Sequence, residues 1–458
     1  MAYTAPAKET VRVVGGLNTQ ADKAALNGGG AIKTVWDAGS PSDFIDTNGG
    51  PIQTATCTFT TIDKNLSGTD IGLNVVEGTL CYVSTGTDTH ITAGIYEITT
   101  VTNDDNIICL NIEDDGNDES VITVNVGGAF DGLQTAVNNK VNNGVAYNRY
   151  IYDNISTETI TSTITVDTYG GTNYVSRIYI IGYNLTLTAE AEVTITTHST
   201  LADGLLVCDG VSYLKFINID FDGGNKTDEA NHCVNFVSTC GFITFSKCKF
   251  HGATNDGVYN GSTVNSHDFL NCEFYDNGDY GYYIYYSRSN NSKIIACSFH
   301  DNVNTGLILQ GNGVTITGCL AYNNTGAGFS IGVAGRGQTL FANCTSYNNT
   351  LDGFNIDLQA YSTILINNTS VDNGGYGYNL GGNTGQFSRF SNNHSSVNTS
   401  GHYSEGADNT FADFKDGDNI AGVQAATDIF TDVDPGSENF TPKTGSDLIN
   451  NGLDAGTA

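Results

Sequence analysis

Four side chains in the middle of the chain could support acid–base chemistry. They are Asp256 in TNDGVYN, Glu273 and Asp276 in CEFYDNGD, and His251 directly before a glycine. Hydrolysis or proton abstraction requires a pair of carboxyl groups, or a carboxylate beside a base. Aspartate also occupies turns for conformational reasons alone, which explains the same residues without catalysis. Because no complete catalytic set is visible, we expect a protein that is not an enzyme, and keep these four as candidates if it is one.

Three tyrosines could bind a ligand or a partner. Tyr259 and Tyr283 each lie two residues after a repeated glycine, and Tyr285 lies two residues further on. Side chains two residues apart on a strand point to the same side, so we expect one outward aromatic patch, which Arg288 extends. Tyrosine faces stack on sugar rings or anchor protein interfaces. Tyrosine is also common on strands, where its ring covers neighbouring residues, so packing is the competing explanation.

An acidic stretch, NIEDDGNDES, is the candidate metal site. It contains Asp114, Asp115 and Asp118, and carboxylate oxygens are the ligands that Ca²⁺ prefers. The alternating spacing and the closing glutamate of an EF-hand loop are missing, and a solvated acidic loop is the favoured explanation of the stretch. The 11 cysteines contain no CxxC pair, which disfavours zinc. We expect no cofactor, with Ca²⁺ as the one ion that this loop would take.

A repeat in the low twenties governs the elements that carry these residues. Cysteines recur with spacings of 24, 25, 22 and 25, and asparagines recur in step with them. The repeated residues are Cys248, Cys272, Cys297, Cys319, Cys344, Asn277, Asn302, Asn324, Asn349 and Asn373. A period of this length, made of short apolar runs and turn residues, predicts a parallel β-solenoid. Like side chains then stack from coil to coil as a structural ladder.

Glycines keep the same step, and the strand after each glycine alternates. The repeated glycines are Gly257, Gly281, Gly306, Gly328, Gly353, Gly377 and Gly401. We expect them at bends with positive φ, which glycine adopts without strain. The first residue after each glycine, such as Val258 or Tyr282, is predicted to point inward. The next residue varies from coil to coil and is predicted to point outward, where partner-specific side chains would lie.

The repeated pattern, Ile-x-x-Cys-x-Phe followed by Asn and Gly, resembles that of a known group over roughly residues 155–405. It is similar to right-handed parallel β-helix proteins of the pectate-lyase-like superfamily. The resemblance implies the fold but not one function, because polysaccharide lyases, epimerases, hydrolases, phage tailspikes and other virion proteins share it. The order of a small β domain, the segment VGGAFDGLQTAV and a β-helix also resembles phage decoration and tailspike-type structural proteins.

The predicted architecture is all-β with five segments. Short alternating runs predict a small antiparallel barrel or sandwich, and apolar residues at helical spacing predict a capping α-helix that covers the exposed end of the solenoid. The segments are an N-terminal arm or irregular segment (1–50), a small antiparallel β domain for attachment (51–127), the capping helix (128–145), the parallel β-helix (146–405) and a C-terminal cap or tail (406–458).

Charge and hydropathy exclude several classes of partner. A formal net charge of −31 disfavours binding to nucleic acid and to anionic membranes. The N-terminal sequence lacks an apolar run preceded by positive charge, so we expect no signal peptide. No stretch approaches the roughly 18 apolar residues that a membrane span needs.

Taken together, these features favour a non-enzymatic phage structural protein located in the virion. A capsid decoration, head-fibre or spike protein would attach to other virion proteins through its N-terminal region. Its β-helix would contact neighbouring subunits or host glycans, and the resemblance to β-helix spikes implies a homotrimer. The alternative is a carbohydrate-active enzyme, that is, a polysaccharide lyase, an epimerase or a glycoside hydrolase. Against it, the basic residues are scattered over different coils, and the motifs of polygalacturonase-like hydrolases and mannuronan epimerases are missing.

Overall fold

The computed structural model divides into two compact units. One comprises Met1–Glu158, Ile164–Ile195 and Val211–Asp220, and the other comprises Thr159–Thr163, Thr196–Gly210 and Phe221–Ala458. The structure describes residues 12–13, 33–34, 53–72, 80–83, 90–92, 94–110, 112–126, 133, 150–153, 157–167, 178–182, 193–226, 229–261, 265–285, 291–311, 313–332, 339–356, 363–380, 389–405, 420–422, 430–432 and 439–442. Within these ranges, no helix is both long enough and apolar enough to span a bilayer.

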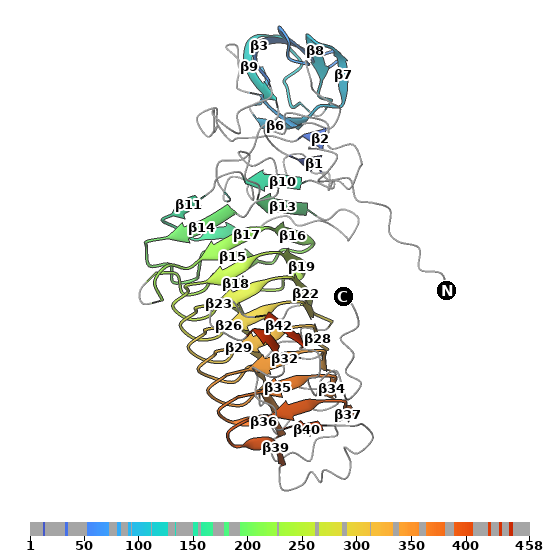
Figure 1. Cartoon of the computed structure of the whole chain (residues 1–458). Helices are drawn as coiled ribbons and strands as arrows, with labels where there is room; N and C mark the ends of the chain where they lie inside the picture. Colours follow the sequence, from blue (N-terminus) through green and yellow to red (C-terminus); the bar gives the residue numbers. More distant parts are fainter. Residues whose placement is uncertain are drawn as a thin grey trace, which may run out of the picture. The chain divides into compact units, whose positions relative to one another are not determined.

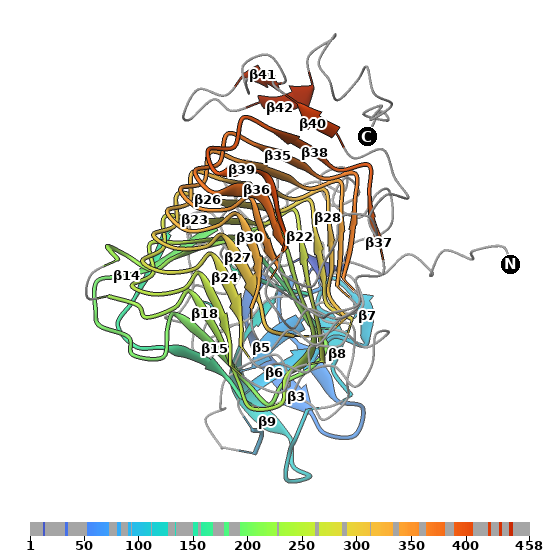
Figure 2. The ribbon, with the colours of Figure 1, turned by 90° about the horizontal axis from the view of Figure 1, so that it is seen from below.

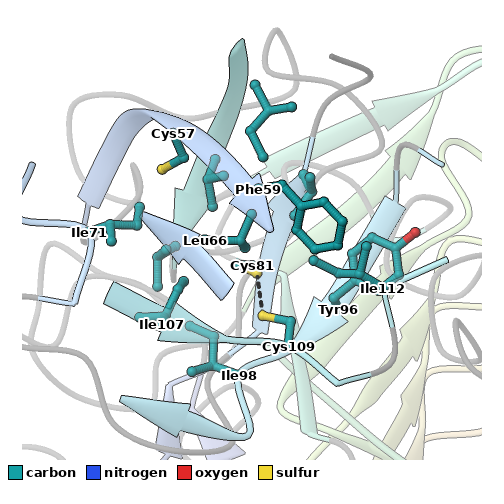
Figure 3. Packing of buried hydrophobic residues seen from close by; sticks show 14 of the residues in the cluster. Cys57, Phe59, Leu66, Ile71, Cys81, Tyr96, Ile98, Ile107, Cys109 and Ile112 are labelled. Atoms are coloured by element: carbon teal, nitrogen blue, oxygen red, sulfur yellow. Dashed lines mark hydrogen bonds between the residues drawn. The ribbon is translucent and has the colours of Figure 1, made fainter. Parts of the chain in front are cut away.

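The first unit contains a seven-stranded antiparallel sheet in the order β6-β5-β9-β3-β4-β8-β7. Its strands are β3 (Gln53–Thr60), β4 (Asn65–Ser67), β5 (Leu80–Val83), β6 (Gly94–Glu97), β7 (Thr100–Asn103), β8 (Asn106–Ile108) and β9 (Glu119–Val126). Alternating side chains of this sheet form a separate hydrophobic core (Figure 3), in which Phe59, Leu66 and Ile107 are buried. Cys81 and Cys109 bring their sulfur atoms within 3.5 Å of each other in this core. The closure of this sheet into a barrel stays a prediction.

The remaining strands of residues 150–222 are short. They are β10 (Tyr150–Asp153), β11 (Thr157–Ile160), β12 (Ile164–Val166), β13 (Ile178–Gly182), β14 (Val193–Thr197), β16 (Leu214–Ile217) and β17 (Ile219–Asp222). Strands β10, β13 and β16 pair in parallel in that order. Parallel pairing between strands separated by about one repeat length is what a solenoid requires.

The second unit coils through three parallel sheets, which Figures 1 and 2 show as three faces of one winding chain. The first sheet contains β19 (Gly241–Ser246), β22 (Asn265–Leu270), β25 (Lys293–Ile295), β28 (Thr315–Thr317), β31 (Leu340–Ala342), β34 (Ile364–Ile366) and β37 (Arg389–Ser391). The second contains β20 (Lys249–His251), β23 (Glu273–Tyr275), β26 (Ser298–His300), β29 (Leu320–Tyr322), β32 (Thr345–Tyr347), β35 (Thr369–Val371), β38 (His394–Ser396) and β40 (Ile420–Gly422). The third contains β15 (Leu206–Asp209), β18 (Val234–Val237), β21 (Val258–Asn260), β24 (Tyr282–Ile284), β27 (Leu307–Leu309), β30 (Phe329–Ile331), β33 (Phe354–Ile356), β36 (Tyr376–Leu380) and β39 (Gly401–Glu405).

Each strand pairs with the equivalent strand one coil away, which confirms the predicted parallel β-helix. Strands β19 to β39 make seven coils of three strands each. On the third sheet, Tyr282 lies opposite Leu307 and Tyr283 lies opposite Ile308. Tyr282 and Leu307 are fully buried, whereas Tyr283 and Ile308 are partly exposed. The register therefore keeps inward positions apolar and leaves the outward positions free to differ.

Two internal ladders run along the coils. In the asparagine ladder, each side-chain amide donates to the amide oxygen of the next coil over 2.8–2.9 Å, from Asn277 to Asn398. In the cysteine ladder, the thiols of successive coils lie inside, and Asn368 and Asn393 occupy the same position in the last two coils. All 11 cysteines of the chain are buried thiols. The ladders satisfy polar groups that the narrow core cannot expose to water.

The repeated glycines do not adopt the conformation that we expected from the sequence. Of the seven, only Gly401 has a positive φ, at 126°. At Gly306 an added Cβ would lie 2.8 Å from the carbonyl oxygen of Gly328 and 3.0 Å from the amide nitrogen of Asn324. At the other six positions glycine is therefore required because successive coils approach too closely for a side chain, not because of a left-handed backbone.

Positive φ is instead taken by residues directly before the ladders. Asp276, Asp301 and Asn323, with φ values of 56°, 55° and 55°, precede ladder asparagines. Asn271 and Ala296, with φ values of 54° and 53°, precede ladder cysteines. Asparagine and aspartate tolerate the left-handed region better than other residues with a side chain, so the corners of the coil favour them.

Several predictions concern parts of the chain that lie mostly outside the described residues. The N-terminal segment is described only at β1 (Arg12–Val13) and β2 (Lys33–Thr34), which pair in parallel. Of the predicted capping helix, 128–145, only Leu133 is described, with a buried side chain. In the tail, β40 pairs in parallel with β38, so the second sheet extends beyond the end that the repeat predicts. Strands β41 (Phe430–Asp432) and β42 (Asn439–Pro442) form an antiparallel pair.

Candidate functional site

Four tyrosines gather on the outer side of the third sheet, and we call them the tyrosine cluster. Tyr259 on β21 lies opposite Tyr283 on β24, both at outward positions. Tyr280 precedes β24 and Tyr285 follows it. The alternation of the strand explains this placement, since the residues flanking Tyr283 point inward and are fully buried. Arg288, which we predicted to extend the group, lies outside the described residues.

The rings of the tyrosine cluster contact one another at an angle rather than in one flat stack. The ring centroids of Tyr259 and Tyr283 lie 5.7 Å apart, and those of Tyr283 and Tyr285 lie 5.6 Å apart, both in edge-to-face geometry. Tyr280 lies 5.0 Å from Tyr283. Tyr285 is 37% exposed. Tyr259, Tyr280 and Tyr283 are partly exposed, so the cluster reaches the surface on two adjacent coils.

A buried histidine and carboxylate lie next to the tyrosine cluster. The Nδ1 atom of His232 lies 3.3 Å from Oδ2 of Asp256, and the two residues are only 7% and 3% exposed. The imidazole stacks on the Tyr259 ring at 4.8 Å, with an angle of 13° between the planes. The backbone N–H of Tyr280 donates to Oδ1 of Asp256 over 3.2 Å. Asp256 thus accepts a hydrogen bond from the backbone that carries the tyrosines and lies against the histidine.

His232 was missed by our reasoning from the sequence, although the repeat contains the signal for it. His232, Asp256 and Tyr280 are spaced by 24 residues and precede equivalent positions of β18, β21 and β24. They occupy the same place in three successive coils. Aligning the coils by position, rather than searching for similar residue types, would have placed them side by side.

Among the residues that the structure describes, the charged groups that act on the tyrosine cluster are mainly carboxylates. Burial raises the pKa of Tyr259 and of Tyr280, and the negative charge of Asp256 raises both further. Burial also raises the pKa of Asp279, and repulsion from Asp256 adds to this, although the amide of Asn304 donates to Asp279 over 2.9 Å. Phenols are un-ionised at neutral pH in any case, and these shifts show that the described carboxylates place a negative field at the rings.

A second outward group, the His–Tyr column, lies on the second sheet. His251, Tyr275, His300 and Tyr322 occupy equivalent positions of β20, β23, β26 and β29. Their rings stack nearly parallel, with successive centroids 4.5, 5.1 and 4.6 Å apart. Register alone brings these four residues together, because each is the last residue of its strand.

Both nitrogens of His300 are held by carboxylates. Nε2 lies 2.9 Å from Oε1 of Glu273, and Nδ1 lies 2.7 Å from Oδ2 of Asp301. Burial lowers the pKa of His300, but the hydrogen bonds to Asp301 and Glu273 outweigh burial and raise the pKa to about 9. The hydrogen bond from His300 lowers the pKa of Glu273. At neutral pH this is a fixed ion group, in which neither residue is suited to exchange protons with a substrate.

The structure distributes the four catalytic candidates over two sheets. Asp256 precedes β21 of the third sheet and is engaged with His232. His251 and Glu273 belong to the second sheet, where His251 lies 3.7 Å from Asp222. Asp276, at the corner after β23, forms an ion pair with Lys226. Each carboxylate therefore has its own cationic or histidine partner.

The candidate calcium residues are hydrogen-bonded to protein donors. Asp114 pairs with Lys64 and accepts from the Thr61 hydroxyl over 2.9 Å. Asp115 lies 3.0 Å from Nδ1 of His90, and Asp118 accepts from the backbone N–H of Thr61 over 2.8 Å. Among the residues that the structure describes, no group of three or more histidine, cysteine, aspartate or glutamate side chains is placed to hold a metal. The Ca²⁺ site remains a prediction.

Comparison with solved structures gives matches at low identity. ORF18 of Geobacillus virus E2 is 18% identical, with a TM-score of 0.46, over 63% of this chain and 56% of that one. The chain thus spans just over half the length of ORF18. Pectate lyase Pel9A is 16% identical, with a TM-score of 0.46, over 66% of this chain and 82% of that one. The A-module of Azotobacter vinelandii mannuronan C-5 epimerase AlgE4 is 15% identical, with a TM-score of 0.41, over 64% and 91%.

Sequence comparison identifies the coiled part of the chain. No curated protein matches the sequence. Residues 232–395 match the family model described as a right handed beta helix region, and this range covers strands from β18 to β38. The strand pairing and this match agree, and the coiled part of this chain is a right-handed parallel β-helix.

Proposed function

We propose that this protein is a non-enzymatic structural protein of a phage particle, and that its tyrosine cluster binds a glycan of the host surface. The observation that carries the proposal is the gathering of Tyr259, Tyr280, Tyr283 and Tyr285 on adjacent coils, where the outward positions vary. Tyrosine combines an apolar ring face with a polar hydroxyl, which suits the C–H and O–H groups of a sugar. Few side-chain torsions must be fixed when tyrosine binds, so the entropic cost is small.

The polar groups of the described coils support a non-enzymatic role. A general acid or base must be able to gain or lose a proton near the working pH. The hydrogen bonds of His300 and Glu273 move their pKa values in opposite directions and away from neutrality. Asp276 is neutralised by Lys226 in an ion pair.

We assign attachment to the antiparallel sheet of β3–β9. That sheet has its own buried core, so it can fold around residues that the β-helix does not supply. It would join other virion proteins, as the attachment part of a capsid decoration, head-fibre or spike protein. Because β-helix spikes resemble this chain and are often trimers, we propose a homotrimer.

A glycan array with matched variants tests the binding role. Wild-type protein is expected to bind a subset of bacterial surface glycans. Tyr283→Ala should weaken that binding at least tenfold while leaving the melting temperature nearly unchanged, because the ring is outward. Ile308→Ala removes an outward side chain at the same position one coil later and serves as the control. Equal binding by the wild-type protein and Tyr283→Ala would contradict the proposal.

Quantitative mass spectrometry of purified particles tests the virion role. The protein should occur at a fixed copy number that is a multiple of three per particle. Absence of the protein from particles that are otherwise complete would contradict the assignment.

One observation favours a carbohydrate-active enzyme as the second candidate. The His232–Asp256 pair lies against Tyr259, so a carboxylate and a histidine do meet beside the tyrosine cluster. This candidate predicts new reducing ends or unsaturated products from a polysaccharide panel, tested with and without Ca²⁺. Asp256→Asn should abolish that activity. Activity retained in Asp256→Asn would exclude this pair as the catalytic group.

A further inference from the structure

We infer that the tyrosine cluster selects glycans without acidic groups and discriminates against uronic, sialylated and sulfated chains. This inference rests on the proposed glycan-binding role and specifies its ligand. It is carried by the charges placed beside the rings, the orientation of the rings and the state of their hydroxyl groups.

The charges of the described residues beside the tyrosine cluster are predominantly negative. Asp256 and Asp279 lie beside the tyrosine cluster, and His232 is the histidine in contact with Asp256. Among the described residues beside the cluster, two carboxylates and one imidazolium sum to −1 even if His232 carries a full positive charge. The rest of the molecule has the same sign, with a net charge of −31. An anionic chain would approach against this field, and an uncharged chain would not.

The aromatic rings of the tyrosine cluster disfavour an anionic ligand. The face of an aromatic ring is its negative side, so a carboxylate or sulfate above it is repelled. The edge-to-face contacts of Tyr283 with Tyr259 and Tyr285 prevent the rings from forming one continuous flat stack. A neutral sugar can place its C–H groups against the exposed ring of Tyr285.

The phenol hydroxyl groups of the tyrosine cluster match the hydrogen-bonding groups of a neutral sugar. Tyrosine phenols keep their protons at neutral pH, and burial and the nearby carboxylates raise the pKa of Tyr259 and Tyr280 further. Each phenol can then donate one hydrogen bond and accept another. Sugar hydroxyls have the same dual capacity, whereas a carboxylate can only accept.

Matched oligosaccharide pairs test the inference by isothermal titration calorimetry in low salt. Each pair shares a backbone and differs in acidic groups: cellohexaose with its glucuronate counterpart, mannohexaose with hexamannuronate, and galactohexaose with hexagalacturonate. The neutral member of the pair that binds should bind about tenfold more tightly or better, because unit charges separated by a few ångströms near a protein surface interact at this level. Asp279→Asn preserves the shape of the side chain. It should reduce the difference in affinity between the neutral and the acidic member severalfold.

The outcomes separate the inference from the proposed function. Asp372→Asn makes the same charge change at a corner of a distant coil, where asparagine tolerates the φ of 58°, and should leave the preference unchanged. Tighter binding of an acidic member would overturn the inference while leaving glycan binding intact. A preference that Asp279→Asn does not alter would also contradict it. Binding of neither member of any pair would count against the proposed function, and the inference would fall with it.

Discussion

His300 shows how a polar side chain can be fixed on the outside of a β-helix. It is 9% exposed, it stacks between Tyr275 and Tyr322, and both of its nitrogens face carboxylates. A buried charge is costly unless it is paired and hydrogen-bonded, and His300 meets both conditions. We therefore interpret the His–Tyr column as a brace between coils of the second sheet.

This interpretation predicts a specific pH dependence of stability. The folded-state pKa of His300, about 9, lies above its unfolded value of about 6.5. The stabilisation is therefore fully present below pH 6.5 and is lost as the pH rises through 9, with a maximum on the order of 3 kcal/mol. His300→Gln should lower the melting temperature most at pH 6 and least at pH 10. The exposed His198→Gln is the control, and a His300→Gln effect independent of pH would contradict the ion group.

At the residue scale, the sequence predicted which side chains point outward better than it predicted which side chains contact each other. Tyr259 and Tyr283 were predicted as neighbours because the glycine spacing fixes the register. The His232–Asp256 contact was not predicted, because it joins unlike residues and no similarity search along the chain connects them. Asp276 was considered as a catalytic group, whereas its pairing with Lys226 depends on a turn conformation that the residue type does not specify.

At the element scale, the asparagine ladder should contribute a large part of the stability of the coils. Asn324 accepts from the amide of Asn302 over 2.9 Å, and its own amide nitrogen lies 3.0 Å from the Phe299 carbonyl and 2.9 Å from Asn349. Asn324→Ala leaves these buried partners unsatisfied and should lower the free energy of unfolding by about 3 kcal/mol or more. The outward Asn355→Ala is the matched control, expected within about 0.5 kcal/mol. Similar losses in both variants, measured by denaturant unfolding, would argue against the ladder.

The close approach of coils predicts the effect of adding a single methyl group. Gly306→Ala would place a Cβ 2.8 Å from the Gly328 carbonyl and 2.9 Å from the Cβ of Phe299, so neighbouring coils must move. We expect a loss of about 1–3 kcal/mol in the free energy of unfolding. Gly332→Ala meets only the flexible side chain of Gln310 and should cost less than about 1 kcal/mol. Thermal unfolding of the two variants distinguishes them, and equal melting temperatures would contradict the steric explanation.

The elements of the β-helix were predictable because each coil repeats the same physical problem. One period governs the inward apolar residues, the stacked amides and thiols, and the glycines where coils approach closely. A wrong interpretation of one coil is therefore corrected by the other coils. The reason for glycine was wrong, because sequence alone does not distinguish a bend from a close contact. The left-handed corners at residues such as Ala296 were missed, since neighbouring coils, and not the residue itself, impose that φ.

At the scale of the whole molecule, the antiparallel sheet of β3–β9 and the coils of β19–β39 should unfold as separate cooperative transitions. The antiparallel sheet buries Phe59 in its own core, and the β-helix buries Phe299 in another. Phe59→Leu and Phe299→Leu should each cost about 1–2 kcal/mol and shift a different transition in scanning calorimetry. A single transition that both variants shift equally would show that the antiparallel sheet and the coils unfold together.

The parts of the molecule that sequence could not settle are those without a repeat. The barrel predicted within residues 51–127 depends on pairing between distant strands, and the segment 128–145, predicted as a capping helix, occurs only once in the sequence. The parallel strand β40 was missed for the same reason, since the tail lacks the cysteine and glycine pattern. Attachment, the homotrimer and the phage particle are proposals at this scale.

The most direct test of the account is a crystal structure of the protein bound to the glycan that binds most tightly on the array. We predict sugar density over Tyr283 and Tyr285, with a hydroxyl hydrogen-bonded to a phenol of the tyrosine cluster and no acidic group facing Asp279. Sugar bound on the second sheet, over His251 and Tyr275, or only on the antiparallel sheet would contradict the central claim.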